Sequence, residues 1–172
     1  MRRRRLIVVL GAALGMLGGL LSASPALAGR GPNWEFVPPE DSIVPASFCG
    51  FEVLIHPVAA KQFAKELKVT DGSETILITG TLKLSFTNLN PGGKTINENA
   101  SSSSTITFNA DGSITTVNRG RAPLVLSPAD AQQFGLPIVS IVAGRLTLST
   151  NPNETPISLN GHFAVDVCAA LS

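Results

Sequence analysis

Two histidines are the residues of this sequence best suited to acid–base chemistry near neutral pH. His56 precedes Pro57 at the end of an alternating apolar segment, and His162 lies four residues before Asp166. A Ser-His-Asp set could assemble from His162, Asp166 and one of the serines. On a strand, however, His162 and Asp166 would be about 13 Å apart, at roughly 3.3 Å per residue. We therefore expect both histidines to be ordinary strand residues, and we assign no catalytic residue.

Other chemical signatures are weak or absent. There is no Gly-x-Ser-x-Gly elbow, no phosphate-binding glycine loop and no His-Glu-x-x-His motif. Arg119 and Arg121 flank Gly120 and could bind an anion, although such exposed arginines more often only keep the protein surface soluble. We expect no metal site and no cofactor. Carboxylate pairs for glycoside hydrolysis could come from Glu35, Glu40, Asp41 and Glu52, but acidic residues near an exposed arm are usually solvated.

The N-terminal residues have the order of a secretory signal peptide. Four arginines at 2–5 precede an uncharged run at 6–21, and Ala26-Leu27-Ala28 forms a small-x-small cleavage signal. Removal of residues 1–28 would leave nine basic residues against twelve acidic ones, a net charge of −3. An acidic domain lacks the basic footprint of a nucleic-acid-binding protein. We expect a secreted, extracellular protein with no nucleic-acid partner and no membrane span after cleavage.

The remaining chain has the length of one domain. Residues 29–46 contain four prolines and predict an extended arm, and residues 47–172 predict a single β domain. In an exported protein, Cys49 and Cys168 are expected to form one disulfide, which would tie the start of the domain to its last strand. Two free buried thiols are the alternative.

Apolar residues alternate with polar ones along most of the domain. The even-numbered series Ile76, Ile78, Leu82, Leu84 and Phe86 passes through Gly80 without changing phase, which favours one bent strand over two strands joined by a turn. A glycine in an inward-facing strand position marks strong coiling or a bend. Asn160-Gly161 also reads as a hairpin turn. We expect four inward bend glycines: Gly80, Gly120, Gly144 and Gly161.

Local signals complete the predicted fold. Asn109 to Gly112 predicts a turn that pairs Phe108 with Ile114, and Ser127-Pro128 predicts the start of a short helix near 128–134. Residues 60–69 fit a strand or a helix. Regular short strands favour an all-β protein, an antiparallel meander closed or nearly closed into a barrel of about 8–10 strands, with a β-sandwich as the alternative.

The segments Cys49-Gly50-Phe51, Thr79-Gly80, Asn109 to Ser113 and Asp166 to Leu171 carry a family resemblance. With these features the chain resembles uncharacterised small exported proteins of high-GC Gram-positive bacteria. The resemblance implies a secreted, disulfide-closed, β-rich domain and supplies no catalytic residue.

Three functions agree with these features. The first is a non-enzymatic barrel that binds a small apolar ligand, because inward glycines would leave room among apolar side chains. The alternative is an extracellular structural or protein-interaction module, which suits the Thr/Ser-rich strands and the proline-rich arm. An enzyme with a site in the barrel mouth is the third choice. The sequence defines neither the partner nor the oligomeric state.

Overall fold

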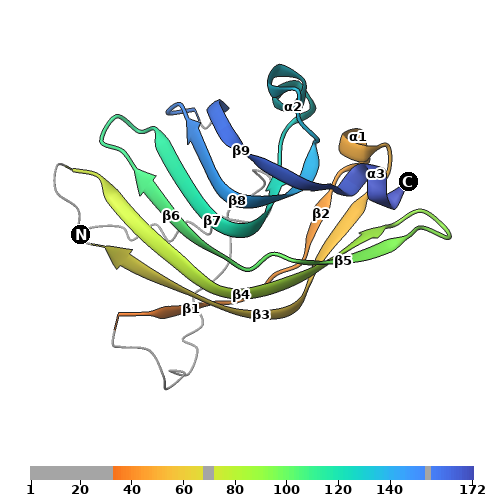
Figure 1. Cartoon of the computed structure of the whole chain (residues 1–172), viewed down its shortest axis with the longest axis horizontal. Helices are drawn as coiled ribbons and strands as arrows, with labels where there is room; N and C mark the ends of the chain where they lie inside the picture. Colours follow the sequence, from red (N-terminus) through yellow and green to blue (C-terminus); the bar gives the residue numbers. More distant parts are fainter. Residues whose placement is uncertain (1–32, 68–71, 154–155) are drawn as a thin grey trace.

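The computed structural model describes residues 33–67, 72–153 and 156–172, and the predicted signal peptide at 1–28 lies outside this part. The described strands form one nine-stranded sheet (Figure 1). Its order is β1-β3-β4-β6-β7-β8-β9, with β2 also pairing with β3 and β5 with β4. Every pairing is antiparallel. The predicted all-β antiparallel class is therefore confirmed.

The elements follow one another in a simple order along the chain. The strands are β1 (Glu35–Val37), β2 (Ser42–Val44), β3 (Val53–Leu67), β4 (Glu74–Asn88), β5 (Thr95–Asn99), β6 (Ser102–Phe108), β7 (Ile114–Val125), β8 (Val139–Thr150) and β9 (Pro156–Asp166). The helices are α1 (Ala46–Cys49), α2 (Pro128–Phe134) and α3 (Val167–Leu171). The helix predicted near 128–134 is confirmed as α2, with Ser127 as its N-cap.

The segment that fitted either a strand or a helix belongs to β3 as far as Leu67. Phe63 pairs with Phe36 on one side and with Thr79 on the other, so neighbours on both sides decide the conformation. The strand also continues through Pro57, beyond its expected end. Pro57 is tolerated because β2 ends its pairing at Ile55 and β1 begins at Gln62, so no edge partner needs the missing N–H.

The proline-rich segment contributes β1 and β2, which pair with opposite ends of β3 (Figure 1). Phe36 on β1 meets Phe63 edge to face, with ring centroids 5.9 Å apart. The ammonium group of Lys65 lies 5.9 Å from the centre of the Trp34 ring. These contacts attach residues 34–37 to β3.

Three of the bend glycines lie in one line across the sheet. Gly80 on β4 pairs with Ser102, Ser102 pairs with Gly120 on β7, and Gly120 pairs with Gly144 on β8. Their φ angles are 146°, 115° and 80°, a conformation that other residues rarely adopt. β4, β7 and β8 run through these glycines as single curved strands (Figure 1). Gly80 is half-buried, whereas Gly120 and Gly144 are exposed.

The fourth glycine, Gly161, lies within β9 and not at a hairpin turn. The β8–β9 register shifts between Ala143 and Thr147, where the partner residues are His162 and Asn160. Gly161 therefore stands opposite a bulge that continues the line of bends to the end of the sheet.

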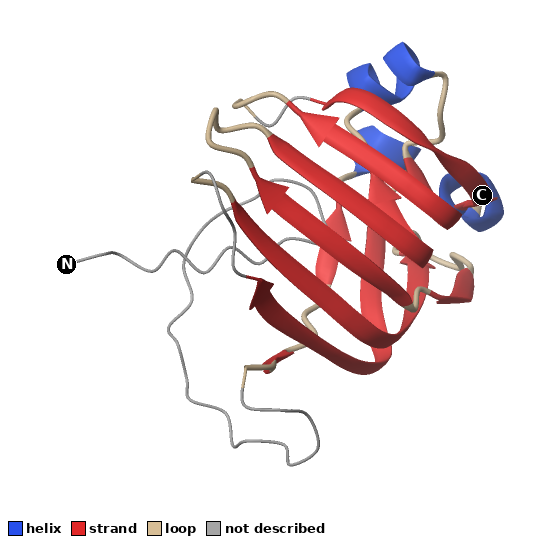
Figure 2. Cartoon of the chain, turned by 60° about the vertical axis from the view of Figure 1, so that its left-hand side comes forward, coloured by secondary structure: helices blue, strands red, loops and turns tan. Residues whose placement is uncertain are grey.

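The predicted closure into a barrel is wrong. Among the described residues, β9 pairs only with β8, and no ladder joins it to the β1–β3 end of the sheet. The strands bend along their own lengths, so the sheet folds over itself, and helices cover apolar surface that closure would have buried. The result is closer to the alternative, a sandwich, although all nine strands belong to one sheet. Figure 2 shows the helices gathered at one end of the strands.

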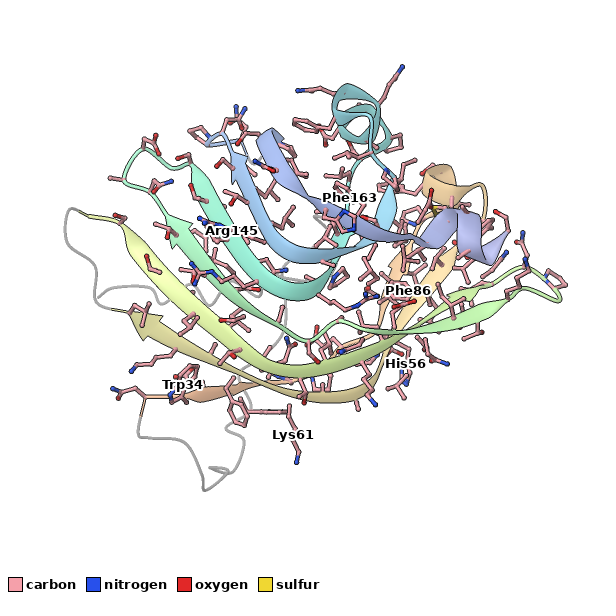
Figure 3. All side chains as sticks on the ribbon, in the orientation of Figure 1. Trp34, His56, Lys61, Phe86, Arg145 and Phe163 are labelled. Carbon is pink, nitrogen blue, oxygen red and sulfur yellow. A yellow bond between two sulfur atoms is a disulfide. The ribbon has the colours of Figure 1, made fainter. Side chains whose placement is uncertain are left out.

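Two apolar clusters fill this folded sheet. The first joins β3 and β4 to the start of β8 and to α3, and includes Phe86 (Figure 3) and Ile141. The second lies between α2 and strands β7 and β8, and includes Val142 and Leu146. Neighbours Ile141 and Val142 point to opposite faces of β8, so both faces are buried there and the start of β8 separates the two clusters.

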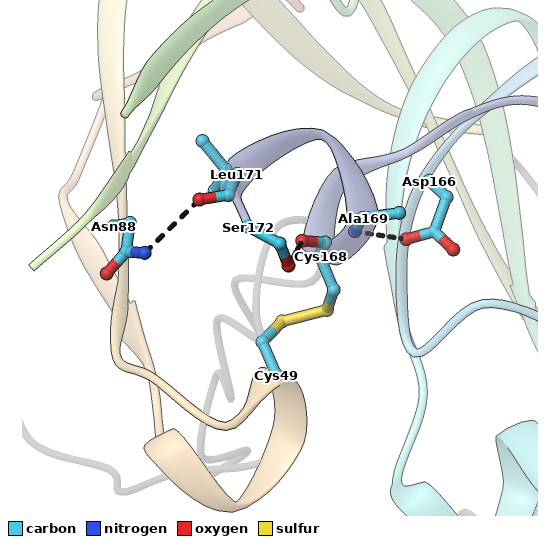
Figure 4. The surroundings of a disulfide bond; sticks show 7 residues. All are labelled: Cys49, Asn88, Asp166, Cys168, Ala169, Leu171 and Ser172. Atoms are coloured by element: carbon cyan, nitrogen blue, oxygen red, sulfur yellow. Dashed lines mark hydrogen bonds between the residues drawn. A yellow bond between two sulfur atoms is a disulfide. The ribbon is translucent and has the colours of Figure 1, made fainter. Parts of the chain in front are cut away.

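The predicted disulfide between Cys49 and Cys168 is confirmed, with 5.3 Å between the two Cα atoms (Figure 4). Cys168 lies in α3, so the expectation that the disulfide holds the last strand is wrong. Asp166 ends β9 because its side chain caps α3, accepting a hydrogen bond from the Ala169 backbone N–H at 3.0 Å. Asn88 donates its side-chain N–H to the Leu171 carbonyl at 3.2 Å, which fixes the helix against β4.

Candidate functional site

The apolar face of β4, β6, β7 and β8 is the first candidate surface. Alternation places its side chains on one side of the sheet, in register from strand to strand. At the centre of this face Ser104 and Asn118 are only 3% and 1% exposed. Ser104 Oγ donates a hydrogen bond of 2.8 Å to Asn118 Oδ1. The half-buried apolar residues of this face are Ile76, Ile78, Phe108, Ile114 and Leu148.

The polar pair lies beside the bend. Asn118 is two residues before Gly120, and Ser104 is two residues after Ser102, so both stand one row away from the line of glycines. A buried amide and hydroxyl cost free energy unless each finds a partner. Their mutual hydrogen bond offsets part of that free-energy cost. The pair is thus a polar group within an otherwise apolar surface.

His56 and Asp41 form the only histidine–carboxylate pair in the described ranges. The His56 Nδ1 and Asp41 Oδ1 atoms are 2.7 Å apart, and both side chains are more than half exposed. Ser85 stands opposite His56, but its Oγ donates to the His56 backbone carbonyl at 3.4 Å and not to the ring. The hydroxyl is thus not activated, and no nucleophile completes a triad here.

The pair considered from the sequence, His162 and Asp166, does not come together. The Asp166 carboxylate is engaged in capping α3, and His162 stands opposite Ala143 with its side chain exposed. The four acidic residues considered for glycoside hydrolysis are all exposed. Of these, Asp41 is joined to His56. Nowhere in the described ranges do three His, Cys, Asp or Glu residues gather as a metal site would require.

The two arginines that flank Gly120 have different surroundings. Arg121 reaches β5, where its guanidinium meets the Glu98 carboxylate at 2.6 Å and donates to the Asn99 carbonyl at 3.0 Å. Arg119 stands directly opposite Arg145 of β8. Sequence inspection missed Arg145, because the pairing of β7 with β8 across α2 has no local signal.

The face opposite the apolar one is rich in hydroxyl groups. One row crosses five strands in register and consists of Thr75, Thr107, Thr115, Ser149 and Ser158. Thr75 Oγ1 and Thr107 Oγ1 are 3.2 Å apart. At the β9 end of this row, Arg145, Thr147, Ser158 and Asn160 line an open depression of about 480 Å³. We call this side of the sheet the hydroxyl face.

No protein-family model, curated protein or solved structure matches the chain. None of the helices in the described ranges has the length and apolar character needed to cross a membrane. The disulfide agrees with an extracellular protein.

Proposed function

We propose that the protein is a secreted, non-enzymatic binding protein that takes a small, largely apolar ligand on the apolar face. The observation that carries this proposal is the set of half-buried apolar side chains around the Ser104–Asn118 pair. Small-molecule sites in proteins typically combine apolar walls with a few fixed polar groups. The open sheet supports the proposal because the described residues leave this surface partly exposed.

The bend line and the disulfide preserve this surface. Glycines 80, 120 and 144 hold the curvature without side chains of their own, and the disulfide fixes the two ends of the domain to each other. A ligand would thus meet a preformed surface, which lowers the entropic cost of binding.

The test is a titration with N-phenyl-1-naphthylamine, an uncharged fluorescent probe of apolar sites. We expect enhanced emission with the wild-type protein and a reduction in the Ile78→Asn and Leu148→Asn variants. Val58→Asn is the matched control, because Val58 is an exposed apolar residue of β3. Circular dichroism checks that each variant is folded. Equal emission from all four proteins would exclude the apolar face as the site.

An extracellular protein-interaction module is the second candidate, and the free edge of β9 favours it. Among the described residues β9 has a strand neighbour on one side only, so its other side presents unpaired N–H and C=O groups. Between Pro156 and Asp166 there is no acidic residue, lysine or arginine to discourage pairing with another strand. Ala164→Pro would block added strands without changing probe emission, so a pull-down with this variant separates the two functions.

A further inference from the structure

Arg119 and Arg145 occupy directly opposite positions of the β7–β8 ladder and point to the hydroxyl face. Like charges directly opposite each other destabilise an antiparallel pair. Both side chains are exposed, and within the described ranges neither forms an ion pair or side-chain hydrogen bond. The fold thus maintains a local repulsion that an anion would relieve.

Arg121 shows that this sheet can compensate an arginine where no ligand is needed. Its guanidinium is shared between the Glu98 carboxylate and a backbone carbonyl of β5. Arg119 is only two residues away on the same strand, and it faces a second cation and no carboxylate. The contrast makes Arg119 and Arg145 the candidates for binding a ligand.

The surface beside Arg145 is hollowed, and each of the four side chains that line it carries a polar group. The depression of about 480 Å³ is lined by Thr147 of β8 and by Ser158 and Asn160 of β9, together with Arg145 itself. Hydroxyl and amide groups donate and accept hydrogen bonds, which suits a ligand that carries hydroxyl groups of its own. Figure 3 labels Arg145 on β8.

We propose that Arg119 and Arg145 bind a phosphate or sulfate ester group, and that the adjoining depression holds the polyhydroxylated carrier of that group. The planar fork of a guanidinium donates two parallel hydrogen bonds to such an oxyanion. This site lies on the face opposite the apolar one. The proposal therefore goes beyond the proposed function and is tested independently of it.

The lining of the depression argues against a nucleic acid as the ligand. Proteins that bind single-stranded nucleic acids stack bases on aromatic side chains. None of the four residues that line the depression is aromatic. Thr147, Ser158 and Asn160 offer hydrogen bonds beside the Arg145 charge, as a sugar or polyol that carries an anionic group requires.

The test measures binding of four soluble probes: poly(glycerol phosphate), dextran sulfate, neutral dextran and single-stranded DNA. We expect the purified protein to bind one of the first two, which identifies the ester as phosphate or sulfate, and to bind the other two more weakly. Each of Arg119→Gln and Arg145→Gln should weaken binding about fivefold, and the double variant should abolish it. Arg121→Gln and Lys61→Gln remove the same charge elsewhere and should leave the affinity within twofold of the wild type.

Thermal melting without ligand gives a second readout. Removing one of two facing cations should leave the melting temperature unchanged or raise it, because the repulsion disappears. A fall in melting temperature would assign the arginines a structural role and overturn the proposal. Undiminished binding by the double variant would overturn it as well, and so would equal binding of neutral dextran or DNA.

Discussion

Gly120 and Gly144 lie directly opposite each other in the β7–β8 ladder, and both have positive φ angles. The twelve residue pairs of this ladder, from Ile114–Thr150 to Val125–Val139, continue without a register shift. Because the bends of the two strands coincide, both can turn without breaking the hydrogen-bonded ladder between them. The aligned glycines thus explain how one continuous sheet folds over its own core.

Alanine substitutions distinguish two reasons for glycine at these positions. One is the positive φ angle, and the other is the lack of space for a Cβ atom. Gly144→Ala should lower the free energy of unfolding by about 1 kcal/mol, because the φ angle is strained for alanine while the space is open. Gly80→Ala should cost at least about 3 kcal/mol, because a Cβ would overlap the Lys61 carbonyl of β3. Urea unfolding followed by circular dichroism measures both. Equal losses would show that close approach of β3 has no part in the choice of Gly80.

The disulfide should contribute strongly to stability, because it closes a loop with a sequence separation of 119. The chain-entropy relation gives about 4–5 kcal/mol for a loop of this size. We expect the Cys49→Ser/Cys168→Ser variant to unfold at correspondingly lower urea concentration with its secondary structure retained before the transition. Intact mass with and without reductant verifies the bond in the wild type. A loss below about 1 kcal/mol would mean that the unfolded chain is already restricted near these ends.

The buried pair Ser104–Asn118 should behave as a coupled unit. Ser104→Ala or Asn118→Leu alone leaves a buried polar group without its partner, at a cost of about 1–3 kcal/mol. The double variant Ser104→Ala/Asn118→Leu removes both groups and should cost less than the two losses added together. Equilibrium unfolding of all four proteins gives the coupling energy. Strict additivity would contradict the hydrogen bond as the reason for their burial.

The β6–β7 turn should be sensitive to acid. Hydrogen bonds from the Ser113 hydroxyl, and then from its backbone N–H, lower the pKa of Asp111 below its ordinary value. Since the folded state favours the carboxylate, this contribution to stability is present above the ordinary pKa and is lost as the pH falls through the lowered one. NMR titration should show the Asp111 pKa rising in Ser113→Ala and unchanged in Ser103→Ala. The same pKa in all three proteins would rule out the hydroxyl as the cause.

Features encoded by neighbouring residues could be predicted from the sequence. Asn109 to Gly112 carries its own turn chemistry, and Phe108 pairs with Ile114 as expected. Two adjacent residues likewise mark the start of α2: Ser127 is the N-cap and Pro128 is the first residue of the helix. The disulfide followed from the count of cysteines in an exported chain. Such signals depend on a few adjacent residues and not on the path of the whole chain.

The rest depends on which strands become neighbours. The alternation along β4 is the same in a closed and an open sheet, because closure is decided by whether the two outer strands meet. Arg119 and Arg145 become neighbours only because β7 and β8, which precede and follow α2 in the chain, pair in one particular register. His56 contacts Asp41, which belongs to the proline-rich segment. No residue spacing in the sequence encodes these relationships, so the hydroxyl face could not be predicted as a site.

The link between Cys49 and Cys168 also determines how the molecule bears mechanical load. Seven strands, β3 through β9, lie between the two cysteines along the chain. A pull applied to the two termini would detach β1 and β2 and then reach the covalent bond, which transmits the tension directly from one end of the domain to the other. Strands β3 to β9, which lie inside that loop, would therefore carry little of the tension.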